Sequence, residues 1–173
     1  MTTEPYAIRL AVPEDIPAAL QMKLQAWEET YGSQRPASFF ANARASLEQQ
    51  GDWWIRGLAQ GAELWIATNP AGDIVGIAGG GPAAEDDADT GIDIELQVLY
   101  VLAAEHGTGL GRRLLDAVLG ERAAVLWVLE HNPRAQAFYA KHGFDADGRM
   151  EPLADDWSGL NEIRMVRRGA HRG

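Results

Sequence analysis

The sequence predicts a mixed α/β fold with a central sheet of about seven strands and about four helices. Strand-like and helix-like segments follow one another in the order β-α-α-β-β-β-α-β-α-β-β. The length of 173 residues and the hydrophobic content of 46% suit one domain with a sizeable core. No internal repeat, long linker or low-complexity tract interrupts the chain. We therefore expect a single domain over residues 6–168 and a short C-terminal tail at 169–173.

Periodicity and turn residues predict the elements of the first half. Pro13-Glu14-Asp15 is typical of a helix start, and apolar residues at helical spacing follow it. Asn69–Asp73 has the composition of a hairpin turn, and glycines at 79–81 are expected to end the strand after that turn. The predicted elements are a strand at 7–11, helices at 13–31 and 37–50, a loop or short helical turn at 57–61, and strands at 63–68 and 74–78.

In the second half, strands and helices alternate. Residues 83–91 carry four acidic side chains and are expected to form a solvated, mobile loop. Asn132 is a good helix N-cap, and Pro133 follows it at the first helical position, where proline is favoured. Gly143 is expected to end that helix. The predicted elements are strands at 92–101, 123–129, 144–150 and 160–167, with helices at 109–119 and 133–142.

Charge and composition exclude several classes of function. The net charge of −10 disfavours binding to the phosphates of nucleic acid and suits a cationic partner. The absence of cysteine excludes disulfides, thiolate metal sites and a cysteine nucleophile, and the histidines lack metal-ligand spacing, so we expect no metal. We find no signal-peptide pattern and no apolar run of membrane-spanning length. We expect a cytoplasmic protein that does not bind membranes, as a monomer or a homodimer.

The stretch from Ile92 to Arg113 leads the search for a site. It is predicted to be a strand, a short connection, a glycine-rich turn and the start of a helix. Glycines permit a close backbone approach, and a helix N-terminus offers unpaired N–H groups with partial positive charge. This combination predicts a seat for phosphate, although a plain turn with solvated arginines is the alternative. The spacing Gly107-x-Gly109-x-Gly111 fits neither the Walker loop nor the dinucleotide fingerprint.

The turn resembles the pattern Gln/Arg-x-x-Gly-x-Gly/Ala, which is the acyl-CoA pyrophosphate loop of the GNAT N-acetyltransferase superfamily. His106 stands where that family usually has Gln or Arg. Residues 132–144 match the family pattern Asn-x-x-Ala-x-x-Phe-Tyr-x-x-x-Gly-Phe position for position, and residues 95–101 resemble its fourth strand. Three motifs occur in the family's order. The resemblance covers about residues 6–168, with its specific motifs inside 92–144.

The resemblance implies a GNAT fold whose sheet is splayed between the fourth and fifth strands. It implies transfer of an acetyl or other acyl group from acetyl-CoA, as co-substrate, to a primary amine. Pantetheine would bind the backbone of the fourth strand, and the pyrophosphate would bind amides of the glycine turn. The implied contacts are Leu99, Tyr100, Val101, His106, Gly107, Thr108, Gly109, Leu110, Gly111, Arg112 and Asn132. Asn132 faces the pantetheine arm in this interpretation, or acts only as an N-cap.

Two side chains are candidates for acid–base catalysis. An unperturbed alkyl amine has a pKa of about 10.4, so deprotonation at neutral pH costs about 4–5 kcal/mol. Glu95 is the candidate general base, directly or through water, because a carboxylate on a central strand just before the probable CoA-binding segment should line the cleft. Simple alternation puts it on one strand face with Asp93, Gln97 and Leu99. It could instead be a solvated carboxylate that only attracts the substrate. Tyr139 matches the family tyrosine that serves the CoA sulfur as general acid, and His131 is a reserve candidate.

A catalytically silent module that binds acyl-CoA for sensing or regulation is the alternative function. The presence of both Glu95 and Tyr139 favours the enzyme. The acceptor would be an amine of a small molecule or peptide. Acidic side chains in the regions that select the acceptor in this fold suggest a cationic amine; they are Glu28, Glu29, Asp155 and Asp156.

Overall fold

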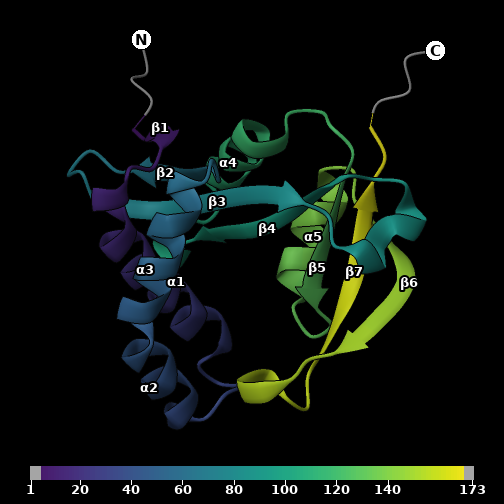
Figure 1. The fold of residues 1–173 in the computed structure, drawn as a ribbon, viewed down its shortest axis with the longest axis horizontal. Helices are drawn as coiled ribbons and strands as arrows, with labels where there is room; N and C mark the ends of the chain where they lie inside the picture. Colours follow the sequence, from purple (N-terminus) through teal and green to yellow (C-terminus); the bar gives the residue numbers. More distant parts are fainter. Residues whose placement is uncertain (1–4, 170–173) are drawn as a thin grey trace. The chain divides into compact units, whose positions relative to one another are not determined.

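The computed structural model describes residues 5–169 as a mixed α/β fold with a seven-stranded sheet (Figure 1). The strands are β1 (Ala7–Leu10), β2 (Leu64–Thr68), β3 (Ile74–Pro82), β4 (Ile94–Val101), β5 (Ala124–Leu129), β6 (Asp145–Pro152) and β7 (Asn161–Arg167). The α-helices are α1 (Ile16–Tyr31), α2 (Ala37–Ala45), α3 (Leu47–Ala59), α4 (Leu110–Leu119) and α5 (Pro133–Lys141). Short 3₁₀ turns cover Pro13–Asp15, Glu85–Thr90, Ala103–Glu105 and Asp155–Trp157. The predicted tail, Gly169 excepted, lies outside the described residues.

The strand order is β1-β2-β3-β4-β5-β7-β6, which confirms the predicted mixed sheet. Contacts between Cα atoms divide the chain into two compact units. The first unit comprises the described residues up to Gly79 together with Val98–Val118. The second unit comprises Gly80–Gln97 and the described residues from Leu119 onward. Strand β4 therefore contributes its first half to the second unit and its second half to the first.

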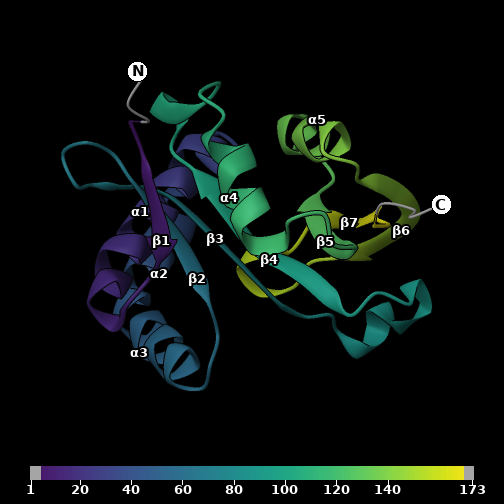
Figure 2. The same ribbon diagram turned by 90° about the horizontal axis from the view of Figure 1, so that it is seen from above.

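The first unit buries one face of α1 against β2 and β3. Its core consists of apolar side chains that recur at helical spacing in α1 and alternate along the strands. In β3, Ile77 faces this core, while a Cβ at the adjacent Gly76 would meet the Leu114 side chain of α4 at 2.8 Å. Helix α4 thus packs on the face of β3 opposite to α1 (Figure 2). The buried members of the α1 core are Ile16, Ala19, Leu20, Met22, Ala26, Leu64, Ile66 and Ile77.

The hairpin between β2 and β3 forms where its composition predicts a turn. The side-chain oxygen of Asn69 accepts hydrogen bonds from the backbone N–H groups of Ala71 and Asp73, both at 3.0 Å. Gly72 has a φ of 89°, which is a conformation that favours glycine. The two strands pair antiparallel, with Ile66 opposite Ile77. Local turn chemistry therefore sets the register of this pair.

The predicted single helix at 37–50 is wrong, and residues 57–59, predicted to belong to a loop or short helical turn, form the end of a longer helix. The chain forms α2, breaks at Ser46 with φ −95° and ψ 1°, and then forms α3. Glycines at 51 and 57 lie inside α3, where they lower helix propensity and misled the prediction. Tertiary packing outweighs that cost, because Trp54 and three further apolar side chains of α3, namely Leu47, Ile55 and Leu58, pack against the α1 core. Trp53, by contrast, is 68% exposed.

The second unit is organised around β5, which pairs with β7 on one side and β4 on the other. The β5–β7 pair is antiparallel along its length, with Trp127 opposite Arg164 and Leu129 opposite Glu162. The β4–β5 pair is parallel, with Glu95 opposite Val125. This parallel pair agrees with the splay that the family resemblance implies. Strand β6 pairs antiparallel with β7, with a register shift between Ala146 and Met150.

The acidic segment 83–91 differs from the predicted solvated, mobile loop. Asp87 is fully buried and accepts hydrogen bonds from the Trp127 indole at 3.2 Å and from the Arg164 guanidinium at 3.1 Å. Arg164 also pairs with Asp89 at 2.8 Å and with Asp147 at 2.6 Å. The segment is therefore tied to β5, β6 and β7 through a buried cation. Strand β3 also continues to Pro82, although its glycines predicted an end at Ala78.

Candidate functional site

The connection from β4 to α4 is a turn of positive-φ glycines that opens onto free space. Gly107 has a φ of 81° and Gly109 a φ of 84°, and α4 begins at the next residue, Leu110. A Cβ built on either glycine would meet no heavy atom within 4 Å. The space that a side chain would occupy is thus open to a ligand. The turn has the backbone conformation and the access that close binding of an anion requires.

Side chains of the turn hold its shape from within. Thr108 donates its hydroxyl to the carbonyl of Glu105 at 2.7 Å and accepts the N–H of Leu110 at 3.4 Å. The Tyr6 hydroxyl donates to the carboxylate of Glu105. The amides of Gly111 and Arg112 follow in the first turn of α4, where an α-helix leaves N–H groups without intrahelical partners. The turn is therefore fixed by its own contacts, while the N–H groups of Gly111 and Arg112 have no acceptor within the helix.

His106 has a local contact in place of the long side chain usual at this position. Its Nε2 atom lies 3.0 Å from the carbonyl oxygen of Val101, which is the last residue of β4. With that nitrogen protonated, the ring donates to the carbonyl and closes the connection back onto the strand. His106 and Val101, which were both predicted to contact the cofactor, thus contact each other. Sequence patterns do not reveal such a pairing.

Arg112 is available to an anionic ligand. Its side chain is 70% exposed, and its Nε atom lies 3.8 Å from a carboxylate oxygen of Asp116 one turn later. A surface pair of this kind contributes little to stability, because solvent screens it and two long side chains lose freedom. The guanidinium can therefore turn toward a phosphate at small cost.

Leu99 and Tyr100 of β4 were also predicted to contact the cofactor. The Tyr100 side chain packs in the core of the first unit, with its ring centroid 6.4 Å from that of Trp27. Burial raises the pKa of Tyr100 to about 12, so the phenol stays neutral. Leu99 is half-buried. A ligand along this part of the strand would therefore use the main chain of Leu99 and Tyr100 rather than the phenol.

The two acidic residues of α1 that were predicted to attract a cationic acceptor each have a partner within the protein. Glu28 pairs with Arg44 of α2 at 2.7 Å, and Glu29 accepts the backbone N–H of Ala103 at 2.8 Å. Glu29 thereby ties the end of α1 to the connection after β4. The negative charge of Glu28 is balanced by the arginine beside it.

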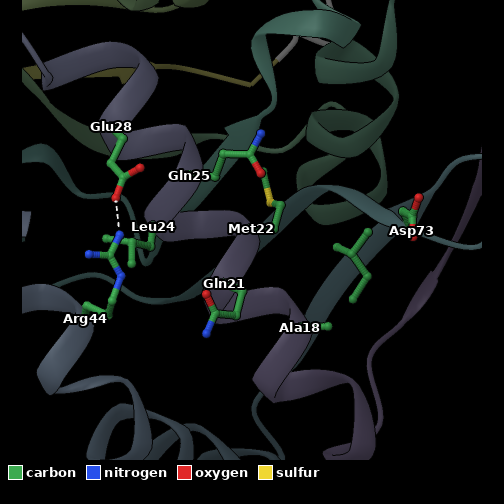
Figure 3. A pocket seen from close by; sticks show the side chains of 9 residues that line it. Ala18, Gln21, Met22, Leu24, Gln25, Glu28, Arg44 and Asp73 are labelled. Atoms are coloured by element: carbon green, nitrogen blue, oxygen red, sulfur yellow. Dashed lines mark hydrogen bonds and ion pairs between the residues drawn. The ribbon is translucent and has the colours of Figure 1, made fainter.

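The Glu28–Arg44 pair lies in an open groove of about 420 Å³ along α1 (Figure 3). Polar side chains of α1 and α2 form one part of its wall, and Asp73 of the hairpin turn and Ile74 of β3 form another. The groove carries both signs of charge, so it offers no clear preference for a cation. Its lining residues are Ala18, Gln21, Met22, Leu24, Gln25, Glu28, Arg44, Asp73 and Ile74.

In the second unit, Glu95 lies half-buried on β4 opposite Val125 of β5. Burial raises the pKa of its carboxyl, and the negative charges of Asp87 and Glu162 raise it further. A hydrogen bond with Gln97 acts in the opposite direction, and it agrees with the predicted alternation that puts both side chains on one face. Burial and neighbouring carboxylates also raise the pKa of Glu162. Glu95 is thus a carboxylate with increased affinity for a proton.

The connection from β5 to α5 is capped by its own side chains. Asn132 is the N-cap of α5, and its side-chain oxygen accepts the N–H of Ala135 at 3.2 Å. Gln136, which the sequence did not single out, donates its amide to the carbonyls of Leu129 at 3.0 Å and Glu130 at 2.8 Å. An amide side chain one turn after an N-cap was the available signal for this contact. Asn132 therefore has the capping role that its sequence position predicts.

Tyr139 is held on α5 by aromatic neighbours. Its ring meets that of Phe138 edge-on at 5.4 Å and that of Phe144 at 5.8 Å. These contacts fix the orientation of a half-buried phenol. His131, the reserve acid–base candidate, has a side chain that is 71% exposed and lies 3.8 Å from the carboxylate of Glu130. Asp155 and Asp156 are exposed on a 3₁₀ turn.

A family model described as an acetyltransferase (GNAT) domain matches residues 60–146. A probable N-acetyltransferase of Mycobacterium tuberculosis is 30% identical over 165 residues, which cover 89% of this chain and 87% of that protein. The chain belongs to the GNAT acetyltransferase family. An uncharacterized N-acetyltransferase of Bacillus subtilis, YuaI, is 27% identical over 92% of this chain and 96% of its own length.

Solved structures share the fold of this GNAT chain at low sequence identity. The PaiA N-acetyltransferase of Thermoplasma acidophilum, crystallised with coenzyme A, superposes with a TM-score of 0.69 at 17% identity, covering 95% of this chain and 99% of that one. YncA of Salmonella typhimurium, a putative acetyltransferase solved with acetyl-CoA, gives a TM-score of 0.70 at 20% identity, covering 98% and 97%. Among the described residues, no helix combines the length and apolar character needed to cross a membrane.

Proposed function

We propose that this GNAT acetyltransferase moves an acetyl group from acetyl-CoA to a primary amine, with Glu95 as general base and Tyr139 as general acid. We include residues 6–168 in the acetyltransferase domain. The observation that carries the proposal is the open turn before α4, where Gly107 and Gly109 have positive φ and free space in front of them. The structural neighbours PaiA and YncA, solved with coenzyme A and acetyl-CoA, support the choice of co-substrate.

The residues of the turn fit the pyrophosphate of coenzyme A. The amides from Gly107 to Arg112 would hold it, with the exposed Arg112 guanidinium adding positive charge. The backbone of Leu99 and Tyr100 would hold the pantetheine arm. When bound, acetyl-CoA supplies an acyl group already activated as a thioester.

Glu95 suits the task of taking a proton from the amine. Only the neutral amine is a nucleophile, and an unperturbed alkyl ammonium is mostly charged at neutral pH. Burial and the charges of Asp87 and Glu162 raise the pKa of Glu95, which makes its carboxylate a stronger base than an exposed one. The same negative charges stabilise a cationic amine before it loses its proton. Proton transfer can pass directly or through one water molecule.

Tyr139 suits the task of supplying a proton or hydrogen bond to the departing sulfur. Its phenol can donate a hydrogen bond, and its ring is oriented by Phe138 and Phe144. His131 fits this role less well, because its imidazole is largely exposed to solvent. The acid role therefore belongs to the tyrosine.

The acceptor in this proposal is a cationic amine of a small molecule or peptide. Glu95 and Glu162 supply negative charge in the second unit, and Asp155 and Asp156 are exposed there. Glu28 contributes little, since Arg44 balances its charge.

Thiol release from acetyl-CoA over a panel of small amines and peptides tests the proposed function. We expect turnover with at least one amine, with the rate rising as the fraction of neutral amine rises. Binding of acetyl-CoA by calorimetry, together with no thiol release on any amine, would instead support an acyl-CoA-binding module without catalysis.

A further inference from the structure

The chain is almost devoid of lysine, and the two lysines that it has lie in different surroundings. Lys23 and Lys141 are the lysines among fifteen lysine and arginine residues. Lys141 is exposed at the end of α5 in the second unit. Lys23 is half-buried between α1 and α3 in the first unit. The exposed amine of Lys141 can therefore serve as an internal reference for the reactivity of the Lys23 amine.

The ε-amine of Lys23 faces two indoles and an amide. Its Nζ atom lies 4.5 Å from the ring centroid of Trp27 in α1 and 5.2 Å from that of Trp54 in α3. The side-chain oxygen of Gln50, also in α3, accepts a long hydrogen bond from it at 3.5 Å. Among residues 5–169, no carboxylate forms an ion pair with Lys23. The groups that face this amine from both helices are thus uncharged.

This environment opposes the charged form of the amine. Cation–π contacts with the two indoles offset part of the lost hydration, yet neither they nor one amide oxygen replaces a carboxylate. Burial lowers the pKa of Lys23 to about 8. At pH 7.5 such an amine is roughly one-quarter neutral, whereas an ordinary lysine is roughly 0.1% neutral. The neutral amine, with its free electron pair, is the nucleophilic form.

We propose that Lys23 is an acylation site of this chain, which takes an acyl group from a thioester such as acetyl-CoA. In the reaction, the neutral nitrogen of Lys23 forms a bond to the thioester carbonyl carbon, and the carbon–sulfur bond breaks. The thiolate leaves with the sulfur electron pair, the nitrogen loses its proton to solvent, and the products are an amide and a thiol. The co-reactant is the same thioester that the proposed function uses.

The α1–α3 surroundings also accommodate the product. Acylation removes the positive charge whose burial is unfavourable, and the aliphatic stem can stay against Trp27 and Trp54. The amide N–H can still donate to Gln50. Each feature that disfavours the ammonium is therefore neutral or favourable toward the acylated side chain.

The test uses the intact wild-type chain and S-acetyl-N-acetylcysteamine, a short thioester without the nucleotide of coenzyme A. Peptide mass spectrometry follows acetylation of Lys23 and Lys141 with time at pH 7.5. We expect Lys23 to react at least about tenfold faster, because its larger neutral fraction outweighs its lower basicity and its partial cover. The ratio should fall as the pH is raised to 10. Equal rates, or a faster Lys141, would overturn the proposal.

A charge-changing variant separates an effect of charge from an effect of access. Gln50→Glu keeps the size of the side chain and introduces a carboxylate beside Nζ, where the amide oxygen now lies at 3.5 Å. The new charge stabilises the ammonium, so acetylation of Lys23 should fall about tenfold while that of Lys141 is unchanged. An unchanged rate at Lys23 in a variant with wild-type circular dichroism would contradict the proposal. Because the donor lacks the nucleotide, neither result depends on the coenzyme A site.

Discussion

Two strand-to-helix connections of this protein, one in each unit, treat the backbone N–H groups at the start of a helix in different ways. The β5–α5 connection joins Leu129 to Pro133, and Asn132 caps the new helix with its own side chain. The β4–α4 connection joins Val101 to Leu110 through glycines at positive φ, and a Cβ at Gly107 or Gly109 would meet no heavy atom within 4 Å. The Asn132 side chain caps one helix start, whereas at the other start the N–H groups of Gly111 and Arg112 have no acceptor within the helix.

This difference suggests that cofactor binding and acid–base catalysis depend on different parts of the protein. A turn that binds an anion through backbone N–H groups does not need a particular side chain, so we expect His106 to be compatible with the binding proposed for this turn. The second unit instead supplies side chains that can exchange protons, namely Glu95 on β4 and Tyr139 on α5. We therefore expect substitutions in the turn to change the affinity for acetyl-CoA, and substitutions of these two side chains to change turnover.

Tyr139→Phe should have the largest effect on turnover. The substitution keeps the ring and its contacts with Phe138 and Phe144 but removes the hydroxyl. We expect kcat to fall by roughly 10²–10⁴-fold, the usual range for an acid–base group. The Kd for acetyl-CoA should barely change, because the interaction matters chiefly in the transition state. Steady-state kinetics and calorimetry measure the two quantities, and wild-type kcat would remove Tyr139 from the acid role.

Glu95→Gln should lower kcat by about 10²-fold at neutral pH, because the amide cannot accept the proton. The wild-type rate should fall as the pH drops through the raised pKa of Glu95, since the ionised form is the base. The variant should lack this acidic limb and recover part of its rate near the pKa of the amine. If Glu95 only attracts a cationic acceptor, KM rises, kcat stays constant, and added salt imitates the substitution in the wild type.

Although Glu95→Gln should lower kcat, it should increase the free energy of unfolding at pH 7. The folded-state pKa of Glu95 is raised, so its stabilising contribution is fully present below the unfolded-state pKa and is lost as the pH rises through the folded-state value. Glu95→Gln should therefore be more stable than the wild type at pH 7 and show no advantage in acid. Urea denaturation at both pH values measures this difference. A destabilised variant at pH 7 would contradict the burial of an ionised carboxylate.

Asn132→Ala should have a smaller effect, of about 1 kcal/mol on the free energy of unfolding, which is typical for loss of an N-cap. Asn132→Asp, which keeps an acceptor oxygen, should restore most of that stability. Both variants should bind acetyl-CoA with nearly wild-type affinity if capping is the main role of the side chain. Stability unaffected by the alanine, with a tenfold weaker Kd, would instead show that Asn132 contacts the ligand.

Local patterns were enough to predict most of the fold. Strand alternation, the hairpin at Asn69–Asp73 and the cap at Asn132 depend on neighbours in sequence, and the structure has them where expected. The failures depend on distant contacts. Asp87 is buried because Arg164, 77 residues away, pairs with it. Helix α3 forms despite its two glycines because Trp54 packs on the α1 core.

The candidate site divides in the same way. The turn at Gly107 and Gly109 could be predicted because positive φ angles favour glycine, and alternation predicted that Glu95 and Gln97 share a strand face. The catalytic role of Glu95 stays a prediction. The contact of His106 with Val101 and the raised pKa of Glu95 depend on how segments pack, which spacing does not reveal. The charge of Glu28 is evident from the sequence, but its ion pair with Arg44, which lies on another helix, is not.

The central claim is that the turn before α4 binds acetyl-CoA through its backbone, and a matched pair of glycine variants tests it most directly. Gly109→Val and Gly72→Val place the same side chain at φ values of 84° and 89°, in both cases with no atom within 4 Å of the new Cβ. Both should lose similar stability, since the backbone strain is alike. By calorimetric titration, Gly109→Val should weaken acetyl-CoA binding by more than about tenfold, whereas Gly72→Val should bind like the wild type. Unchanged affinity in a folded Gly109→Val protein, or equal losses in both variants, would contradict the account.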